Sequence, residues 1–324
     1  MQRGMLTSTS GNGCVNDFSR TLAALAWEQK IPVNAVTIFS GGTEGVLSPH
    51  VTFFVSEEQS GPSGLSACVG RTRHLLPHEV GSAQHARQVA LTVVQLMKEA
   101  TVTPEQVHLV LVKCPLLTSA KLEVIRAEGR TPITTDTYES MSKSRYASAI
   151  GIAVALGEIA EGALEDALSL GEAWSAKASC SSGAELDDCH ILLLASTTAS
   201  EKPLTSTQGE LRVISKPMTD AIDAASILDL LDQVKKDEGK VVQVFAKAEA
   251  DPRGHIRGWR HTMNTDSDIH STRHARAAVG GLIAGLVSDT QIYVSGGAEG
   301  QGAPGGGSLC STGLAAAGPS NPCM

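Results

Sequence analysis

Three serines in distant parts of the chain head similar loop sequences that could do chemistry. SGGTEG begins at Ser40, SGGAEG begins at Ser295, and the looser copy SSGAEL begins at Ser181. The first two follow strand-like runs and the third leads into one. Glycines after a strand let a ligand approach the backbone closely, because they carry no side chain. A serine there can act as a nucleophile, and backbone N–H groups of the loop can face a developing oxyanion.

Two lysines close otherwise apolar strand-like segments. VHLVLVKCP contains Lys113 and VVQVFAKAE contains Lys247, and an amphipathic helical pattern precedes each segment. A buried ammonium group is unfavourable unless it meets a partner or loses its proton. A neutral lysine and a serine form a base and nucleophile pair, and we expect burial and nearby cations to make Lys113 neutral near pH 7. At the equivalent place in the first copy, within MLTSTSGNG, the sequence has Ser8.

Three arginines open helical segments that are rich in small residues. Arg145 precedes YASAIGIAVALG and Arg276 precedes AAVGGLIAGLV, and a shared Ile-Ala pair sets their alignment. Arg20, before TLAALAWE, is the matching residue of the first copy, while Arg273 competes with Arg276 for the same role. A guanidinium group donates to carbonyl oxygens as a planar fork. These arginines are therefore candidates to hold a flat ligand.

The elements that must position these residues form a repeated unit of strand, helix, lysine strand, helix with arginine, serine strand and loop. We predict an α/β fold of three similar repeats with pseudo-threefold symmetry, with a β-barrel-like centre and helices outside. The repeats are expected at residues 1–61, 62–208 and 209–324. The first is expected to be truncated at its start, and the third to lose its strand pattern after residue 310. Such symmetry would bring the serines, lysines and arginines to one axis, around a flat ring with three carbonyl groups.

Composition favours a soluble protein that acts on a small molecule. The net charge is −8 and the longest basic run is the pair Lys235-Lys236, so we expect neither nucleic acid nor an anionic membrane as a partner. No apolar window reaches the roughly 18 residues of a membrane span and no signal-peptide pattern is found, so we expect a cytoplasmic protein. The seven cysteines lack CxxC spacing and are expected to be reduced. Cys180 is expected to pack rather than to react.

Several longer segments carry a more specific pattern: GNGCVND, FSGGTEGVLSPH, VKCPLLT, TTDTYESMSKSR, FAKAEA, HTMNTDSDIHSTRHAR and YVSGGAEGQG. Together they resemble the family of cyanuric acid amidohydrolases and barbiturases, which are ring-opening amidohydrolases. The resemblance runs from about residue 11 to residue 310. It implies three repeats around one active site that hydrolyses a cyclic amide, with cyanuric acid as the first expected substrate and barbiturate as the second. It also implies a homotetramer and no cofactor for catalysis.

The resemblance further implies roles for individual residues. Ser181 is the expected nucleophile and Lys113 its base, acting through an acyl-enzyme to give carboxybiuret and then biuret and carbon dioxide. Substrate-binding residues are expected in all three repeats: Arg20, Ser40, Gly41, Arg145, Ser182, Lys247, Arg276, Ser295 and Gly296. A structural Mg²⁺ or Ca²⁺ is expected at a carboxylate and at largely backbone oxygens: Glu249, Ala298, Gln301, Gly302, Ala303 and Gly306.

A protein that binds cyclic imides without turning them over is the alternative from a different class. The first repeat has Ser8 in place of a lysine and lacks an opening strand and helix, and the sequence after residue 310 shows no alternation. Missing strands would expose the edges of a closed sheet. The sequence is therefore compatible both with a ring-opening hydrolase and with a protein that only binds cyclic imides.

Overall fold

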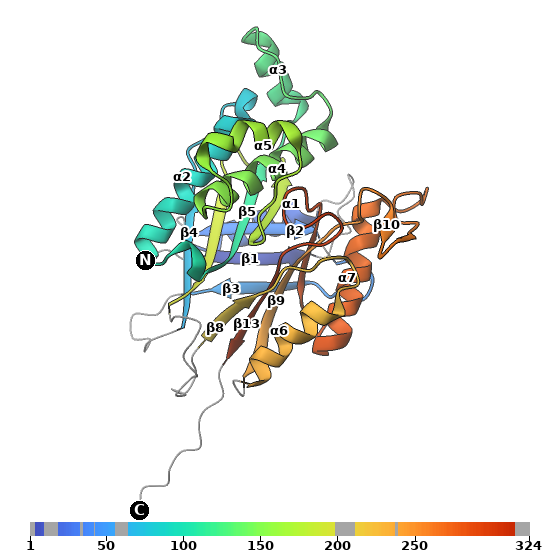
Figure 1. The fold of residues 1–324 in the computed structure, drawn as a ribbon. Helices are drawn as coiled ribbons and strands as arrows, with labels where there is room; N and C mark the ends of the chain where they lie inside the picture. The colour runs from blue at the N-terminus through green and yellow to red at the C-terminus, as the bar shows by residue number, and fades with distance from the viewer. Residues whose placement is uncertain are drawn as a thin grey trace, which may run out of the picture.

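Within the described residues, the strands form three larger sheets and one two-stranded hairpin, with helices on the outside (Figure 1). The computed structural model describes residues 4–9, 19–32, 35–41, 43–55, 64–197, 211–236 and 239–314. The segment GNGCVND and the residues after Leu314 lie outside these ranges.

The first of the larger sheets has three strands, in the order β2-β1-β3. Its elements are β1 (Gly4–Thr9), α1 (Ser19–Glu28), β2 (Val36–Gly41) and β3 (His50–Phe54). β2 runs parallel to β1, whereas β3 is antiparallel to it. Helix α1 covers the outer face, where Ala24 packs against Phe39.

The second sheet has four strands in the order β4-β7-β5-β6. The strands are β4 (Leu65–Arg71), β5 (Val107–Pro115), β6 (Ala178–Gly183) and β7 (His190–Ser196). The helices of this part are α2 (Ala83–Ala100), α3 (Ser119–Ala127), α4 (Thr137–Ala155) and α5 (Leu164–Leu170), with short 3-10 turns at Pro77–Glu79, Pro104–Gln106 and Glu161–Ala163. Helices α2 and α4 pack on the sheet, and α3 projects from the body in Figure 1.

The third sheet repeats this arrangement with the order β12-β9-β13-β8. Its strands are β8 (Leu211–Ser215), β9 (Lys240–Ala248), β12 (Tyr293–Gly296) and β13 (Leu309–Leu314), and its helices are α6 (Ala224–Lys236) and α7 (Ser271–Val287). A small hairpin of β10 (His255–Ile256) and β11 (Trp259–Arg260) precedes α7. Both four-stranded sheets have the same order. The first strand of the repeat (β4 or β8) is followed across the sheet by the last strand (β7 or β13), the lysine strand (β5 or β9) and the serine strand (β6 or β12). The predicted α/β architecture of three repeats is confirmed, while the boundaries at residues 61 and 208 stay a prediction.

One expectation about the third repeat was wrong. The strand pattern was expected to end after residue 310, but β13 continues to Leu314 and pairs with both β8 and β9. Ser311 and Thr312 are buried between these neighbours. Backbone hydrogen bonds to two flanking strands form regardless of whether the side chains alternate, so these small polar residues complete the strand.

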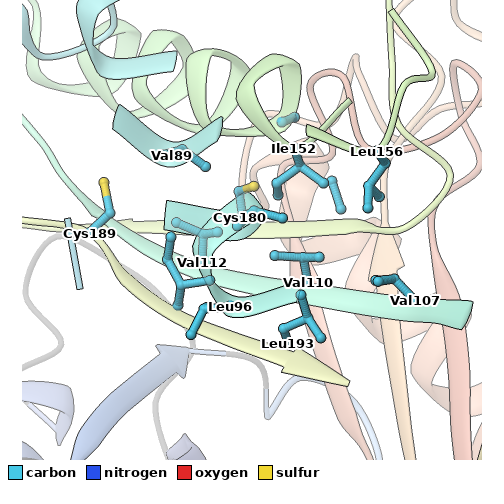
Figure 2. Packing of buried hydrophobic residues seen from close by; sticks show 14 of the residues in the cluster. Val89, Leu96, Val107, Val110, Val112, Ile152, Leu156, Cys180, Cys189 and Leu193 are labelled. Carbon is cyan, nitrogen blue, oxygen red and sulfur yellow. The ribbon is translucent and has the colours of Figure 1, made fainter. Parts of the chain in front are cut away.

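Alternation along each strand separates an outer core from a central one. In β5, Val110 and Val112 point outward and pack under the helices, beside Val89 and Ile152 (Figure 2). Leu111, between the two valines, points inward to the central core. This period of two is the ordinary geometry of a strand.

The central core is shared by all three sheets. Its buried members come from every repeat: Val36, Ile38, Val69, Leu109, Leu111, Leu192, Leu194, Val213, Phe245, Tyr293 and Cys310. Strand β2 contacts β7, β7 contacts β8, and β1 contacts β12, so each sheet touches the other two. The inward rows of the lysine and serine strands end in polar residues, which places these side chains at one end of the core. No helix within the described ranges has the length and apolar character needed to cross a membrane.

His85 is a fully buried histidine between α2 and α4. The N–H of Gly81 donates to its Nδ1 over 3.1 Å, so the imidazole proton lies on Nε2, which faces Ser148 Oγ at 3.0 Å. Burial lowers the pKa of His85 to about 3. Protonation of Nδ1 would break the bond from Gly81 and bury a charge.

We predict that this histidine makes the fold sensitive to acid. Its pKa is 6.5 when unfolded and about 3 when folded, so the unfolded chain takes up a proton first and stability falls as the pH drops below 6.5. One such group changes the free energy of unfolding by up to about 1.4 kcal/mol per pH unit. Denaturant unfolding between pH 7 and pH 5 should show that the free energy of unfolding falls with this slope. His85→Gln should remove the part of the slope that one proton contributes, up to about 1.4 kcal/mol per pH unit. His255→Gln, at an exposed position, is the control, and equal slopes for the two variants would contradict the prediction.

Candidate active site

A pocket of about 560 Å³ lies where the serine strands end. Ser40, Ser181 and Ser295, one from each repeat, all line it. It also contains six of the other residues named from the sequence: Gly41, Arg145, Ser182, Arg273, Arg276 and Gly296. The structure therefore brings the three loop serines together, and both arginines that competed for one role reach the same pocket. The side chain of Arg20 lies outside the described residues.

The register of the parallel strands explains how each serine meets its neighbour. The serine lies directly opposite the residue at the lysine position in all three repeats: Ser8 opposite Ser40, Lys113 opposite Ser181, and Lys247 opposite Ser295. Side chains at directly paired positions of neighbouring strands lie on the same face. Lys113 and Ser181, and likewise Lys247 and Ser295, thus share the inward face at the end of the core.

The pair in the third repeat is already hydrogen-bonded. Lys247 Nζ donates to Ser295 Oγ over 3.0 Å and to the carbonyl of Cys180 over 2.6 Å. Ser40 Oγ in turn lies 3.2 Å from Ser295 Oγ and donates to it. Complete burial, together with the charge of Arg145, lowers the pKa of Lys247 to about 7. A lysine with such a pKa exchanges protons near neutrality.

The pair in the second repeat is arranged differently. Lys113 is buried, donates to the carbonyls of Phe39 and Ser182 over 2.8 and 3.2 Å, and lies 3.4 Å from Glu185 Oε1. Ser181 Oγ is buried and makes no well-formed hydrogen bond. Its hydroxyl is thus available to a ligand in the pocket, although Lys113 does not donate to it in this conformation.

The lysines also connect neighbouring repeats. Lys113 of the second repeat binds the carbonyl of Phe39, which precedes Ser40 of the first. Lys247 of the third repeat binds the carbonyl of Cys180, which precedes Ser181 of the second. Each buried lysine therefore holds in place the serine strand of the repeat before it.

Cys180 lies next to Ser181 but faces away from the pocket. Its side chain belongs to the outer core beneath the helices. Burial raises the pKa of the Cys180 thiol well above its usual value, so the thiol keeps its proton. A buried neutral thiol is a poor nucleophile, which agrees with a packing role.

Three of the predicted cation ligands, Glu249, Ala298 and Gly302, line one pocket. Burial, with a smaller effect of Glu299 and Asp251, raises the pKa of the Glu249 carboxyl to about 7, and the N–H of Gly305 donates to it over 3.1 Å. Among the described residues, no cluster of three or more His, Cys, Asp or Glu side chains could hold a metal. A cation here would depend on backbone carbonyls and on this one carboxylate, a donor set that fits a hard cation.

Gln301 can contribute only its backbone oxygen to such a site. Its side-chain nitrogen donates to the carbonyl of Gly297 over 3.0 Å, and its side-chain oxygen accepts from the N–H of Cys180. The residue is completely buried. Its side chain therefore ties the third loop to the strand that carries Ser181.

Several residues at the site were not named from the sequence. The fifth residues of the Ser-Gly-Gly-x-Glu loops, Glu44 and Glu299, contact arginines, and their place in the repeated motif was the signal that could have identified them. Tyr293 lies two residues before Ser295 on the inward face, and nothing in the sequence distinguishes it from a core residue. Burial raises the pKa of its phenol, while interactions with the three loop serines oppose this rise.

The glycines of the third loop make room for the protein's own arginines. A Cβ atom on Gly296 would lie 2.7 Å from Arg276 Nη1, and one on Gly297 would lie 2.8 Å from the guanidinium of Arg145. The sequence pointed to an approaching ligand. In the structure, the groups that approach the loop are the guanidinium groups that line the pocket.

Comparison with known proteins identifies close relatives over nearly the whole chain. The family described as amidohydrolase ring-opening protein matches residues 4–312. A cyanuric acid amidohydrolase of a Sarocladium species is 69% identical over 303 residues, which are 93% of this chain and 86% of the relative. Another, from Pseudonocardia dioxanivorans, is 58% identical over 307 residues, covering 94% of this chain and 87% of the relative.

Solved structures of similar proteins share the fold. One, described as "Cyanuric acid hydrolase: evolutionary innovation by structural concatenation", has a TM-score of 0.83 and 39% identity and covers 96% of this chain and 90% of that chain. The cyanuric acid hydrolase of A. caulinodans has a TM-score of 0.85 and 42% identity, with coverage of 97% and 90%. The resemblance predicted from the sequence segments is confirmed.

The close approach of Gly296 to Arg276 leads to a prediction about stability. Gly296→Ala should destabilise the protein by about 1–3 kcal/mol, because the new methyl group overlaps a buried guanidinium. Gly281→Ala in α7 is the matched control, since a methyl group there meets nothing within 4 Å and alanine favours a helix. Thermal unfolding of both variants measures the difference. A Gly296→Ala protein as stable as Gly281→Ala would contradict this account of the loop.

Proposed function

The chain belongs to the family of ring-opening amidohydrolases, and we propose that it opens the ring of cyanuric acid by hydrolysis. The observation that carries the proposal is the meeting of Ser40, Ser181 and Ser295 in one pocket. Cyanuric acid is a flat ring with three equivalent carbonyl groups. Three serines from three similar repeats offer one hydroxyl to each carbonyl, and the arginines add planar donors.

We assign the nucleophile to Ser181 and the base to Lys113. The register that pairs the two residues supports this assignment, as does the absence of a well-formed hydrogen bond at Ser181 Oγ. Lys113 reaches Ser181 by a change of side-chain rotamer, since Lys247 already contacts Ser295 from the equivalent position. Burial of Lys113 favours the neutral form that a base requires, whereas the Glu185 carboxylate, 3.4 Å from Nζ, favours the charged form.

The reaction then proceeds in two stages. Ser181 Oγ bonds to a ring carbonyl carbon, its proton passes to Lys113, and the ring C–N bond breaks as Lys113 returns the proton to the departing nitrogen. Water next attacks the acyl-enzyme as Lys113 takes one of its protons, and the ester bond then breaks as Lys113 gives this proton to Ser181 Oγ. The released carboxybiuret loses carbon dioxide to give biuret.

The remaining loop residues stabilise charge and hold the ring. Ser40 and Ser295 donate to the two carbonyls that do not react, and Lys247 supports Ser295 through its 3.0 Å hydrogen bond. Gly41, Ser182 and Gly296 follow the three serines, and their N–H groups are candidates for oxyanion donors. One such donor contributes about 3–4 kcal/mol in enzymes where it has been removed.

Three further properties are proposed on the family resemblance. A structural Mg²⁺ or Ca²⁺ would bind Glu249 and the backbone oxygens of the Ala298–Gly306 loop, and we assign no catalytic step to it. The protein would be a homotetramer in the cytoplasm. The desolvated carboxyl of Glu249 supports the first of these properties, because a divalent cation favours the ionised form.

Substitution of the reacting pair tests the assigned chemistry. Ser181→Ala and Lys113→Ala should each lower kcat for cyanuric acid by more than about 10³-fold, because the residues act as one unit. Cys180→Ala, at the neighbouring position, should keep most of the activity because its thiol lies in the outer core. Release of biuret and carbon dioxide provides the assay.

The same assay separates the alternatives. Faster turnover of barbiturate than of cyanuric acid would assign the chain to the barbiturases, and binding without turnover would make it a non-catalytic protein. If Ser295→Ala abolished turnover and Ser181→Ala did not, the roles of the two serines would be exchanged.

The cation proposal has its own test in thermal unfolding. Added Ca²⁺ or Mg²⁺ at about 100 times its dissociation constant should stabilise the fold by about 2.7 kcal/mol. Glu249→Gln should remove this gain, whereas the exposed Glu161→Gln should retain it. An equal gain in both variants would place the cation elsewhere.

A further inference from the structure

Two arginines that line the pocket, Arg145 and Arg276, each bind one glutamate through the same pair of hydrogen bonds. Arg145 donates from Nε to Glu299 Oε2 over 2.7 Å and from Nη2 to Glu299 Oε1 over 2.6 Å. Arg276 donates from Nε to Glu44 Oε2 over 2.7 Å and from Nη2 to Glu44 Oε1. Two parallel bonds hold a guanidinium coplanar with its carboxylate. The plane of each arginine is thus fixed by a partner.

Both glutamates come from a different repeat than the arginine they hold. Glu299 is the fifth residue of SGGAEG in the third repeat and holds Arg145 of the second. Glu44 is the fifth residue of SGGTEG in the first repeat and holds Arg276 of the third. The glutamate of the loop motif therefore binds the arginine of the preceding repeat in both cases, if the third repeat is counted as preceding the first.

Because Nε and Nη2 bind the glutamate, Nη1 of each arginine is left to face a loop that lines the pocket. Arg145 Nη1 donates to Ser182 Oγ over 3.3 Å. Arg276 Nη1 lies against Gly296, where a Cβ atom would be only 2.7 Å away. Ser182 and Gly296 are equivalent, because each directly follows the loop serine. A ring oxygen in the pocket would thus meet Nη1 in both subsites.

We infer that Glu44 and Glu299 are positioning residues for substrate binding, which act through the arginines and do not touch the ring. The inference rests on the proposed function, since it concerns the ring that the arginines would hold. Both pairs are largely buried, with the Arg276 and Glu44 side chains each 8% exposed and those of Arg145 and Glu299 11% and 27%. Without its carboxylate, a buried guanidinium carries an unbalanced charge and loses its fixed plane.

The corresponding glutamate of the second repeat has a different contact. Glu185 lies 3.4 Å from Lys113 Nζ, and its carboxylate folds over Gly183, where a Cβ atom would be 2.2 Å from Oε2. The motif position therefore contacts the proposed base in the repeat that carries the proposed nucleophile. The experiments use only the two arginine-binding copies.

Glutamine substitution removes the negative charge while keeping the shape of the side chain. Glu44→Gln and Glu299→Gln should each raise KM for cyanuric acid by about 10- to 100-fold, with kcat lowered less than 10-fold. Glu79→Gln is the matched control, because Glu79 is also buried and binds Arg73 through two 2.7 Å bonds outside the pocket. It should lower the melting temperature by a similar amount and leave KM unchanged. An unchanged KM in both loop variants, or an equal rise in Glu79→Gln, would overturn the inference.

A double-mutant cycle separates positioning from a general loss of structure. If Glu299 acts through Arg145, then Arg145→Lys and the double variant with Glu299→Gln should have the same KM within about threefold. If the increase in KM of the double variant equals the product of the increases in the two single variants, the two residues act independently and the inference is overturned. This cycle remains informative if Glu44→Gln does not fold, because Glu299 is the more exposed of the two glutamates.

Direct binding distinguishes failure of this inference from failure of the proposed function. Calorimetric titration of cyanuric acid into Ser181→Ala measures binding without turnover. If this protein binds the ring and added Glu299→Gln does not weaken binding, the positioning role is wrong while the function stands. If wild-type protein neither binds nor hydrolyses cyanuric acid, the proposed function fails, and the inference fails with it.

Discussion

Burial of two lysine side chains at the end of an apolar core is the constraint on which the rest of the site depends. Lys113 and Lys247 are 1% and 0% exposed, and strand alternation leaves them no other direction. An ammonium group in such a place needs partners, and the chain supplies backbone carbonyls from the serine strands. The lysines are thereby tied to the strands that carry the serines. The same burial lowers the pKa of Lys247 to about 7, within the range that is useful for proton transfer.

These contacts make the three repeats dependent on one another. Lysines reach across to the preceding repeat through carbonyls, and loop glutamates reach across to hold arginines. Neither kind of contact could form within an isolated repeat. A pocket assembled in this way is rigid because each of its walls is fixed by another repeat, and rigid donors favour recognition of a flat ring.

The symmetry is broken where chemistry requires it. Ser8 stands opposite Ser40 in the register that the lysines occupy in the other repeats. Tyr293 occupies the position that Ile38 and Ser179 hold two residues before the other loop serines. Only one carbonyl carbon of the ring is attacked in each turnover, so three equal serine and lysine pairs are not needed. The first repeat can therefore lack a lysine without losing its hydroxyl from the pocket.

The sequence by itself determined the lysine and serine strands, the arginine helices and the equivalence of the repeats, because alternation and motif spacing are local properties. It also placed Ser8 in the correct register by counting. Only the tertiary structure decided which glutamate holds which arginine, since these partners lie 154 and 232 positions apart in the chain. It likewise decided that the glycines of the third loop face guanidinium groups, that β13 continues to Leu314, and that Ser181 Oγ makes no well-formed hydrogen bond. Such contacts depend on how separate sheets pack around one core, and no local pattern encodes that packing.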